Sequence, residues 1–327
     1  MAADSPQTSR PNVVVLIPLR DDWASAAELV RHLDRALTSQ PYLVEILLVD
    51  DGSAEECPAA DFSSGYLAIR NIRVLRLRRN LGHQRAIAIG LAHIHSAMPC
   101  DAVLVMDGDG EDTAEGALDL IRAFTGKTAI FAKRSRRTES FTFRLFYQIY
   151  KRLHYMLTGV RVQVGNFSIL PSKYLRTLVV TSELWNHYAA AVFRCGLPLT
   201  TIPIPRGRRF FGKSKMNFVA LTAHGMSAIS VFGDVVGVRL LVGSLIGSLL
   251  AAAGIVAVIA VRSFTNRAIP GWATYSIGAL AIILIQCVTI ASSFTFAFLA
   301  NRINLSFVPL RDFELFIDGF KDVYHND

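Results

Sequence analysis

Cysteine is scarce in this chain of 327 residues, and charged residues make up only 18% of it. The four cysteines form no CxxC pair and lack the spacing of metal ligands, so we predict a reducing compartment and no disulfide framework. An apolar leader is also missing, because residues 1–12 are polar and contain two prolines. We therefore expect a disordered tail at 1–12 and no signal peptide.

Hydrophobic residues, in contrast, reach 52% of the chain and concentrate after residue 237. Residues 238–261 and 272–300 are two apolar stretches, and at about 1.5 Å rise per residue each helix would cross a bilayer. Apolar positions at helical spacing precede them, which predicts an interfacial amphipathic helix at 217–237. Gly243 and Gly247 lie four apart, a spacing that favours close helix packing and would suit a homo-oligomer.

The net charge is +8, and the last of three basic groups spans residues 206–215. No nucleic-acid-binding motif accompanies this charge, so we expect no nucleic acid partner. The last group would bind phosphate groups or, alternatively, attract anionic lipid headgroups. The loop between the two apolar stretches holds only Arg262 and Arg267, fewer positive charges than the outer flanks. The positive-inside rule therefore predicts that both termini, including a tail at 301–327, are cytoplasmic.

The first two thirds of the chain alternate short apolar runs with helical patterns. Runs at 13–17, 45–49, 74–77 and 103–106 predict buried strands, and 24–38 and 82–97 predict helices. This alternation indicates a parallel, three-layer α/β sheet in a domain covering 13–216. A further amphipathic pattern at 141–157 predicts a helix that packs on the core or lies on the bilayer.

Two of the predicted strands run directly into paired aspartates, Asp50 with Asp51 and Asp107 with Asp109. The carboxyl ends of parallel strands meet at one edge of the sheet, where open α/β sheets bind ligands. Gly108 allows the backbone to turn, so that Asp107 and Asp109 can converge on one hard cation. The alternative for Asp107 and Asp109 is a solvated acidic turn, and the alternative for Asp50 and Asp51 is a helix N-cap with a turn glycine.

Several motifs, taken in order, resemble those of the GT-A family 2 glycosyltransferases, and in particular the membrane-bound dolichol- or polyprenyl-phosphate sugar synthases. They are Pro-Leu-Arg-Asp-Asp at 18–22, Val-Asp-Asp-Gly-Ser at 49–53, Asn-Leu-Gly-His-Gln at 80–84, Asp-Gly-Asp at 107–109, Gly-Asn-Phe at 165–167 and Arg-Phe-Phe-Gly-Lys-Ser-Lys at 209–215.

The resemblance implies a role for each matching position. Asp107 and Asp109 would bind Mg²⁺ or Mn²⁺ at the diphosphate of a nucleotide sugar, and Asp109 would be catalytic. Donor binding is implied for Pro18, Leu19, Asp21, Asp50, Asp51, Gln84 and Asp107. Binding of the lipid phosphate or the leaving diphosphate is expected for Arg206, Arg209, Lys213, Ser214 and Lys215.

The chain departs from the family pattern at two motifs. The first loop normally reads Pro-x-Tyr-Asn-Glu, and close relatives carry Gly-Asp-Phe where this chain has Gly165-Asn166-Phe167. If that aspartate is a general base, Asn166 cannot replace it, because an amide has no useful proton affinity. Glu183 or His187, four apart on a predicted helix at 182–194, could supply the base instead. Glu111 and Asp112 are a third alternative.

A polyprenyl phosphate is already ionised near neutral pH and needs no base. We therefore predict a membrane-anchored glycosyltransferase that moves a sugar, with inversion as the resemblance implies, from a nucleotide sugar to a polyprenyl phosphate at the cytoplasmic leaflet. The alternatives are a catalytically silent scaffold, an accessory to translocation of a lipid-linked sugar, a transferase with a non-phosphate acceptor, and an enzyme of sugar-nucleotide metabolism. A processive synthase would carry more spans and a Gln-x-x-Arg-Trp motif, which is absent.

Overall fold

The computed structural model describes residues 10–63, 65–134, 141–160, 164–212, 218–265, 271–303 and 307–326. The chain divides into two compact units. The first comprises Met1–Phe143, Val162–Val231 and Phe307–Asp327, and the second comprises Arg144–Arg161 and Phe232–Ser306. The segment that follows both apolar stretches therefore returns to the unit that precedes them.

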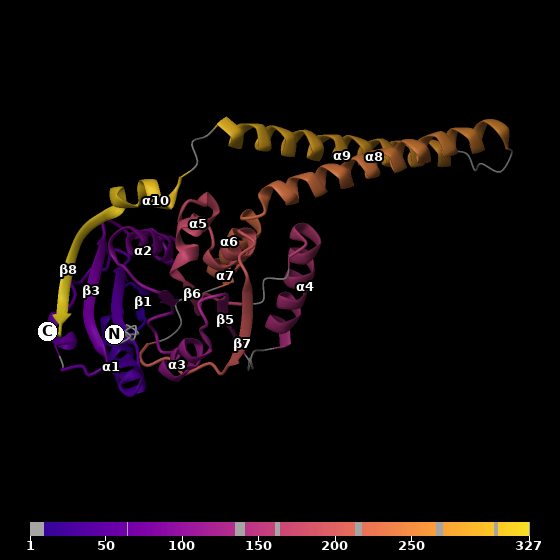
Figure 1. Ribbon diagram of the computed structural model, residues 1–327. Helices are drawn as coiled ribbons and strands as arrows, with labels where there is room; N and C mark the ends of the chain where they lie inside the picture. The colour runs from indigo at the N-terminus through magenta and orange to yellow at the C-terminus, as the bar shows by residue number, and fades with distance from the viewer. Residues whose placement is uncertain are drawn as a thin grey trace, which may run out of the picture. The chain divides into compact units, whose positions relative to one another are not determined.

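The first unit is built on a sheet whose strand order is β7-β5-β6-β4-β1-β2-β3-β8 (Figure 1). The strands are β1 (Asn12–Leu19), β2 (Leu43–Asp50), β3 (Ile69–Leu77), β4 (Ala102–Val105), β5 (Ala129–Arg134), β6 (Ser168–Pro171), β7 (Leu199–Ile204) and β8 (Ile317–His325). β1 pairs in parallel with β2 and β4, and β2 with β3. The four strands that the sequence predicted are therefore parallel as expected, whereas β6 and β8 are antiparallel to their neighbours and make the sheet as a whole mixed. A short apolar run does not encode the direction from which its strand enters a sheet.

Helices cover both faces of this sheet (Figure 1), which confirms the predicted three-layer α/β class. α1 (Trp23–Leu37) and α3 (Ala114–Ala123) pack on one face, and α2 (His83–Ala97), α5 (Leu175–Val179) and α6 (Tyr188–Arg194) pack on the other. Along β1, Val13 and Val15 belong to one core cluster and Val14 and Leu16 to the other. Because both faces are buried, the strand reads as a continuous apolar run.

The C-terminal segment forms α10 (Pro309–Asp312), the short helix η4 (Phe313–Phe316) and the edge strand β8. β8 runs antiparallel to β3, and Arg73 Nε lies 3.0 Å from Asp322 Oδ1 across the pair. The backbone N–H of Tyr66 donates to the hydroxyl of Tyr324 at 3.1 Å. The sequence analysis predicted no helix or strand in this tail, but β8 adds an edge strand to the sheet.

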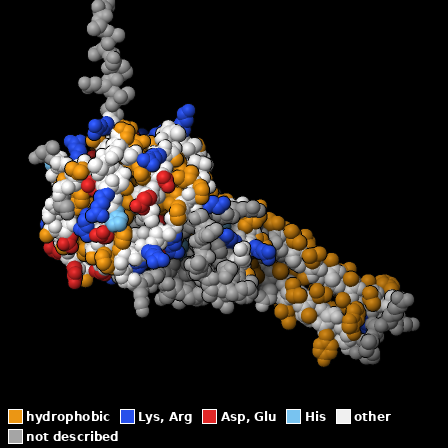
Figure 2. Space-filling model, turned by 90° about the horizontal axis from the view of Figure 1, so that it is seen from below, with side chains coloured by type: hydrophobic (Ala, Val, Ile, Leu, Met, Phe, Trp, Pro, Cys, Tyr) orange, Lys and Arg blue, Asp and Glu red, His pale blue; other side chains and the backbone are white. Residues whose placement is uncertain are grey.

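The second unit contains α4 (Phe141–Thr158) from Arg144 onward, α8 (Gly233–Phe264) and α9 (Trp272–Ile303). By length and composition, α8 and the part of α9 from Trp272 to Ala297 are each long and apolar enough to cross a membrane. Figure 2 shows hydrophobic side chains gathered along this elongated helical part. The helix predicted at 217–237 differs, since α7 (Phe218–Ser230) ends before α8 begins.

Glycines bring α8 close to α9 within the second unit. A Cβ at Gly247 would lie 2.9 Å from Cys287 Sγ, and one at Gly254 would lie 3.1 Å from Leu280 Cδ1. Gly243, by contrast, has no described atom within 4 Å of that position. The close-packing glycines of this hairpin are therefore Gly247 and Gly254, and the predicted partner Gly243 faces away. The homo-oligomer stays a prediction.

Candidate active site

The loops at the carboxyl ends of β1, β2 and β4 lie side by side. The backbone N–H of Asp51 donates to Leu19 O at 2.9 Å, and that of Met106 donates to Leu16 O at 3.1 Å. A Cβ at Gly108 would lie 3.0 Å from Ile17 Cγ2 and 3.8 Å from Pro18 O. Both acidic pairs therefore follow strands that flank β1, and the predicted donor residues Pro18 and Leu19 lie between them.

The loop after β1 is tied to the loop after β2. Asp21 adopts φ 49°, a left-handed conformation that aspartate tolerates better than most side chains. Its backbone N–H donates to Ser53 Oγ at 2.9 Å, and its Oδ1 accepts from Ala54 N at 2.8 Å. The two motifs that the resemblance assigns to the donor thus form one connected surface.

Asp50 and Asp51 both accept hydrogen bonds from backbone N–H groups. Asp50 Oδ1 accepts from Ser53 N at 2.8 Å, which closes the turn after β2. Asp51 Oδ1 and Oδ2 accept from Leu81 N and Gly82 N at 2.7 and 2.9 Å. Burial raises the pKa of Asp51, although these amides oppose the shift. This pair organises the loops, including the one that begins α2, and its predicted contact with the donor stays a prediction.

Asp107 and Asp109 follow β4 in a tight turn. Asp107 N donates to Asp112 Oδ2 at 3.0 Å, and Glu111 N donates to Asp109 Oδ1 at 2.9 Å. Burial raises the pKa of Asp109, the nearby charge of Asp107 adds to the shift, and Arg209 opposes it. Two carboxylates that repel each other in a half-buried turn are stabilised by a cation.

The carboxylate oxygens of this turn are suitable ligands for a divalent cation. The described residues contain no group of three or more His, Cys, Asp or Glu side chains that could enclose a metal ion. Asp107 and Asp109 would therefore supply two oxygen ligands and leave the rest to phosphate and water. Mg²⁺ is commonly held in this way, by one or two carboxylates plus substrate phosphates.

The basic loop after β7 lies on the Asp109 turn. Gly207 N donates to Glu111 O at 2.9 Å, and Phe210 N donates to Asp109 O at 3.0 Å. A Cβ at Gly207 would lie 2.5 Å from Gly110 O, so this approach requires glycine. The structure thus brings together two segments about a hundred residues apart.

Two arginines of this loop pair with the acidic turn. Arg209 NH2 donates to Asp109 Oδ2 at 2.5 Å, and its NH1 lies 3.7 Å from Asp22 Oδ2. Arg206 pairs with Glu111. The predicted phosphate-binding residues Arg206 and Arg209 therefore lie at the site, whereas Lys213, Ser214 and Lys215 fall outside the described residues.

A chain of side chains reaches Asp107 from α6. Gln84 Oε1 accepts from Tyr188 N at 2.7 Å, and Gln84 Nε2 donates to Asn166 Oδ1 at 3.1 Å. Asn166 Nδ2 lies 3.0 Å from His83 Nε2, which in turn lies 3.0 Å from Asp107 Oδ1. The structure therefore brings the predicted residues Gln84 and Asn166 to the same edge as the acidic pair.

The alternative bases Glu183 and His187 do not share a helix face, so that expectation is wrong. Residues 182–194 form a 3₁₀ turn, η3 (Ser182–Trp185), and then α6. His187, extended at φ −161°, breaks the helix and caps α6, since its Nδ1 accepts from Ala190 N at 3.3 Å. Glu183 Oε1 pairs with Arg194 Nε at 3.2 Å.

Sequence reasoning missed His224 on α7. Its Nε2 lies 3.2 Å from His187 Nε2, and because His187 Nδ1 accepts a hydrogen bond, His187 Nε2 carries the proton and donates. Burial lowers the pKa of His224, and the charge of His83 lowers it further. A contact between residues 37 positions apart in different elements has no local sequence signal.

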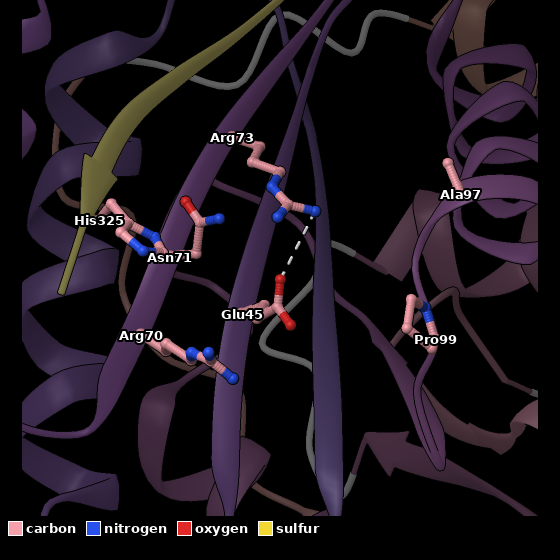
Figure 3. A pocket seen from close by; sticks show the side chains of 7 residues that line it. All are labelled: Glu45, Arg70, Asn71, Arg73, Ala97, Pro99 and His325. Atoms are coloured by element: carbon pink, nitrogen blue, oxygen red, sulfur yellow. Dashed lines mark ion pairs between the residues drawn. The ribbon is translucent and has the colours of Figure 1, made fainter. Parts of the chain in front are cut away.

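A separate cavity of about 220 Å³ lies near the amino ends of β2 and β3 (Figure 3). The side chains of Glu45, Asn71 and Arg73 line it, with Ala97 and Pro99 opposite, and Arg73 NH1 lies 3.6 Å from Glu45 Oε2. Its position at the other end of these strands excludes it as part of the acidic site.

The sheet and its acidic carboxyl edge define an α/β domain of the GT-A class. The profile of "Glycosyl transferase family 2" matches residues 14–178, and the chain belongs to this family of glycosyltransferases.

Among curated proteins, the chain is similar to the undecaprenyl-phosphate 4-deoxy-4-formamido-L-arabinose transferases. It is 26% identical to that of Klebsiella pneumoniae (strain 342) over 73% of this chain and 75% of the relative. It is 28% identical to that of Salmonella choleraesuis over 74% and 73%. Both matches extend beyond the family profile, because they cover about three quarters of each chain.

Solved structures similar to this chain are more distant. Mannosyl-3-phosphoglycerate synthase from Rubrobacter xylanophilus gives a TM-score of 0.48 at 15% identity, covering 68% of this chain and 72% of that one. Glucosyl-3-phosphoglycerate synthase from Mycobacterium tuberculosis, in complex with Mn²⁺ and UDP-glucose, gives 0.48 at 12% identity, covering 68% and 79%.

Proposed function

We propose that this glycosyltransferase moves a sugar from a nucleotide-sugar donor to a polyprenyl phosphate at the cytoplasmic face of a membrane. The observation that carries the proposal is the half-buried Asp107–Asp109 turn, with Arg209 held against Asp109. The acceptor class is supported by the relatives, whose names describe transferases acting on undecaprenyl phosphate.

Asp107 and Asp109 are the residues that would hold Mg²⁺ or Mn²⁺. When bound, such an ion stabilises negative charge on a diphosphate leaving group. Arg209 already counters the charge of Asp109, and its planar guanidinium suits phosphate oxygens equally well. The loop that carries Arg209 is fixed to the acidic turn by two backbone hydrogen bonds, so the guanidinium is positioned before substrate arrives.

The chemistry of the acceptor follows from the side chains near Asp107. Asn166 cannot take a proton, Glu183 pairs with Arg194, and His187 caps α6. Glu111 pairs with Arg206, and Asp112 accepts from Asp107 N. His83 lies against Asp107, and although burial lowers the pKa of this imidazole, the charge of Asp107 raises it overall and favours the protonated ring, which is not a base. A hydroxyl acceptor would need a base, whereas a phosphate monoester, with a second pKa of about 6, is already a nucleophile at neutral pH. This favours a phosphate acceptor over a sugar hydroxyl.

The topology of the first unit supports an even number of membrane crossings. β8 follows both apolar helices and pairs with β3, which precedes them. If α8 and α9 both span the bilayer, the two flanking segments must lie on the same side. The positive charges of these flanks, compared with Arg262 and Arg267 in the intervening loop, favour the cytoplasmic side.

The test uses the purified full-length chain in detergent or vesicles, with polyprenyl phosphate and a panel of radiolabelled UDP- and GDP-sugars. We expect organic-extractable label that depends on Mg²⁺ or Mn²⁺ and on the lipid. Donor binding without transfer to any lipid would favour a silent scaffold, and donor turnover without lipid would favour sugar-nucleotide metabolism. Either outcome would overturn the proposal.

A further inference from the structure

The side-chain amide of Gln84 is buried, at 9% exposure, between α6 and the loop that holds Asn166. We propose that Gln84 is a positioning residue, which sets the direction of the Asn166 carboxamide so that its NH2 group faces the Asp107 edge and donates to a phosphate oxygen of a substrate. This inference rests on the glycosyl-transfer function proposed above and deepens it.

The donor and acceptor roles along this series of hydrogen bonds follow from the backbone N–H of Tyr188. A backbone N–H can only donate, so the Gln84 atom 2.7 Å from Tyr188 N must be the carbonyl oxygen. The amide nitrogen of Gln84 then faces Asn166 and can only donate, so the Asn166 atom at 3.1 Å must be Oδ1. Rotation of either amide by 180° would oppose two donors or two acceptors.

The Asn166 NH2 group is therefore left facing His83 Nε2 at 3.0 Å. The same ring nitrogen lies 3.0 Å from Asp107 Oδ1, and one nitrogen cannot both donate to a carboxylate and accept from an amide. Whenever His83 donates to Asp107, the Asn166 NH2 group has no acceptor among the described residues. A substrate oxygen can fill this place.

The chemical class of that oxygen follows from its neighbours. This fixed N–H donor faces the Asp107–Asp109 turn, where Arg209 pairs with Asp109 and the proposed cation would lie, and such a place suits an oxygen that bears negative charge. Both the donor diphosphate and the acceptor phosphate offer such oxygens. An aspartate at position 166 would accept from Gln84 but would have no N–H to donate to such an oxygen.

The decisive variant is Gln84→Glu, which keeps the size of the side chain. One oxygen of the new carboxylate still accepts from Tyr188 N, while the other must be met by the Asn166 NH2 group, so the Asn166 oxygen turns toward the site. We expect kcat/KM to fall about ten- to a hundred-fold, the loss expected for one hydrogen bond to a charged group. A rise in KM for the lipid identifies the acceptor phosphate, and a rise in KM for the nucleotide sugar identifies the donor diphosphate.

Asn166→Ala decides whether Gln84 acts through Asn166. We expect Asn166→Ala to lower kcat/KM to a similar extent, and adding Gln84→Glu to it to change the value by less than about two-fold. Gln40→Glu makes the same chemical change between α1 and β2, at the opposite end of β2 from the acidic loops, and should leave kcat/KM unchanged. Thermal unfolding of each variant separates a folding defect from an effect at the site.

Three results would overturn the inference while leaving the proposed function intact: full activity of Gln84→Glu, an undiminished effect of Gln84→Glu in the Asn166→Ala background, or wild-type activity of Asn166→Asp. The second would instead assign Gln84 to direct contact with a substrate. Absence of lipid-linked product from the wild-type chain would count against the proposed function itself.

Discussion

Asp50–Asp51 and Asp107–Asp109 are similar acidic pairs at the ends of the two strands that flank β1, yet they make different bonds. Both oxygens of Asp51 accept backbone N–H groups of the loop before α2. Asp109 has one oxygen on a backbone N–H and the other on the guanidinium of Arg209. Asp51 is therefore committed to the protein backbone, although its neighbour Asp50 also lies 3.9 Å from Arg76 Nε, whereas Asp109 is balanced by the charge of a side chain.

This difference is the reason why we assign the proposed metal ion to the second pair and not to the first. A carboxylate that satisfies two buried N–H groups cannot leave them without exposing unmade hydrogen bonds, at a cost of about 1–3 kcal/mol each. An arginine side chain can exchange one anion for another, because its guanidinium keeps its charge and can pair with a phosphate oxygen in place of the carboxylate. Whether a carboxylate at the sheet edge can become a metal ligand thus depends on the hydrogen bonds and ion pairs that its oxygens already make.

Asp109→Asn should break the comparison most strongly. The amide lacks the charge that holds a divalent cation, so we expect transfer activity to fall by more than about a hundred-fold, in the range seen when an electrostatic group of a transition state is lost. Mn²⁺ binding, followed by the electron paramagnetic resonance of free Mn²⁺, should weaken in parallel. Retention of both would remove the metal role from this turn.

Arg209→Gln sharpens the same contrast from the other side. Without the guanidinium, Mn²⁺ has no competitor for Asp109 and should bind several-fold more tightly. The value of kcat/KM should fall about ten-fold, because a contact with a phosphate group of the substrate is lost. Arg206→Gln is the matched control for Mn²⁺ affinity, since Arg206 pairs with Glu111 and not with the aspartate pair. Weaker Mn²⁺ binding in Arg209→Gln would show that Arg209 supports the metal site and does not compete for it.

Asp51→Asn tests the first pair. Its NH2 group must face either Leu81 N or Gly82 N, so one buried backbone donor loses its acceptor. We expect the free energy of unfolding to fall by about 1–3 kcal/mol. Mn²⁺ affinity should change little at a temperature where the variant is folded. A stable Asp51→Asn protein with weakened donor binding would instead assign Asp51 to the nucleotide.

Much of this could be predicted from the sequence, because strand ends and apolar runs are local. The runs at 13–17, 45–49 and 103–106 became β1, β2 and β4, and the three-layer class and the family are confirmed. Locality also set the limits. The antiparallel direction of β6 and the pairing of β8 with β3 depend on the path of the whole chain.

The site shows the same division. Arg209 was predicted as a phosphate ligand, but its pairing with Asp109 joins residues 100 positions apart. The roles of His187 and His224 depend on a cap and on a ring contact between separate helices. The pattern at 182–194 predicted one helix, because the spacing of apolar residues does not show that His187 adopts an extended backbone conformation.

The pH dependence of stability gives the smallest expected effect. Because burial raises the pKa of Asp109, the metal-free folded state binds more protons than the unfolded chain between the ordinary aspartate pKa of about 3.9 and the raised value. The free energy of unfolding should therefore decrease as pH rises through this window. Asp109→Asn should flatten that slope, as measured by denaturant unfolding at several pH values in chelator.

Asp51 contributes a slope of the same sign, because burial raises its pKa as well, and Asp109→Asn leaves that share in place. An unchanged slope in Asp109→Asn would mean that Arg209 fully compensates the burial of Asp109, and the two acidic pairs would then differ only in their hydrogen bonds.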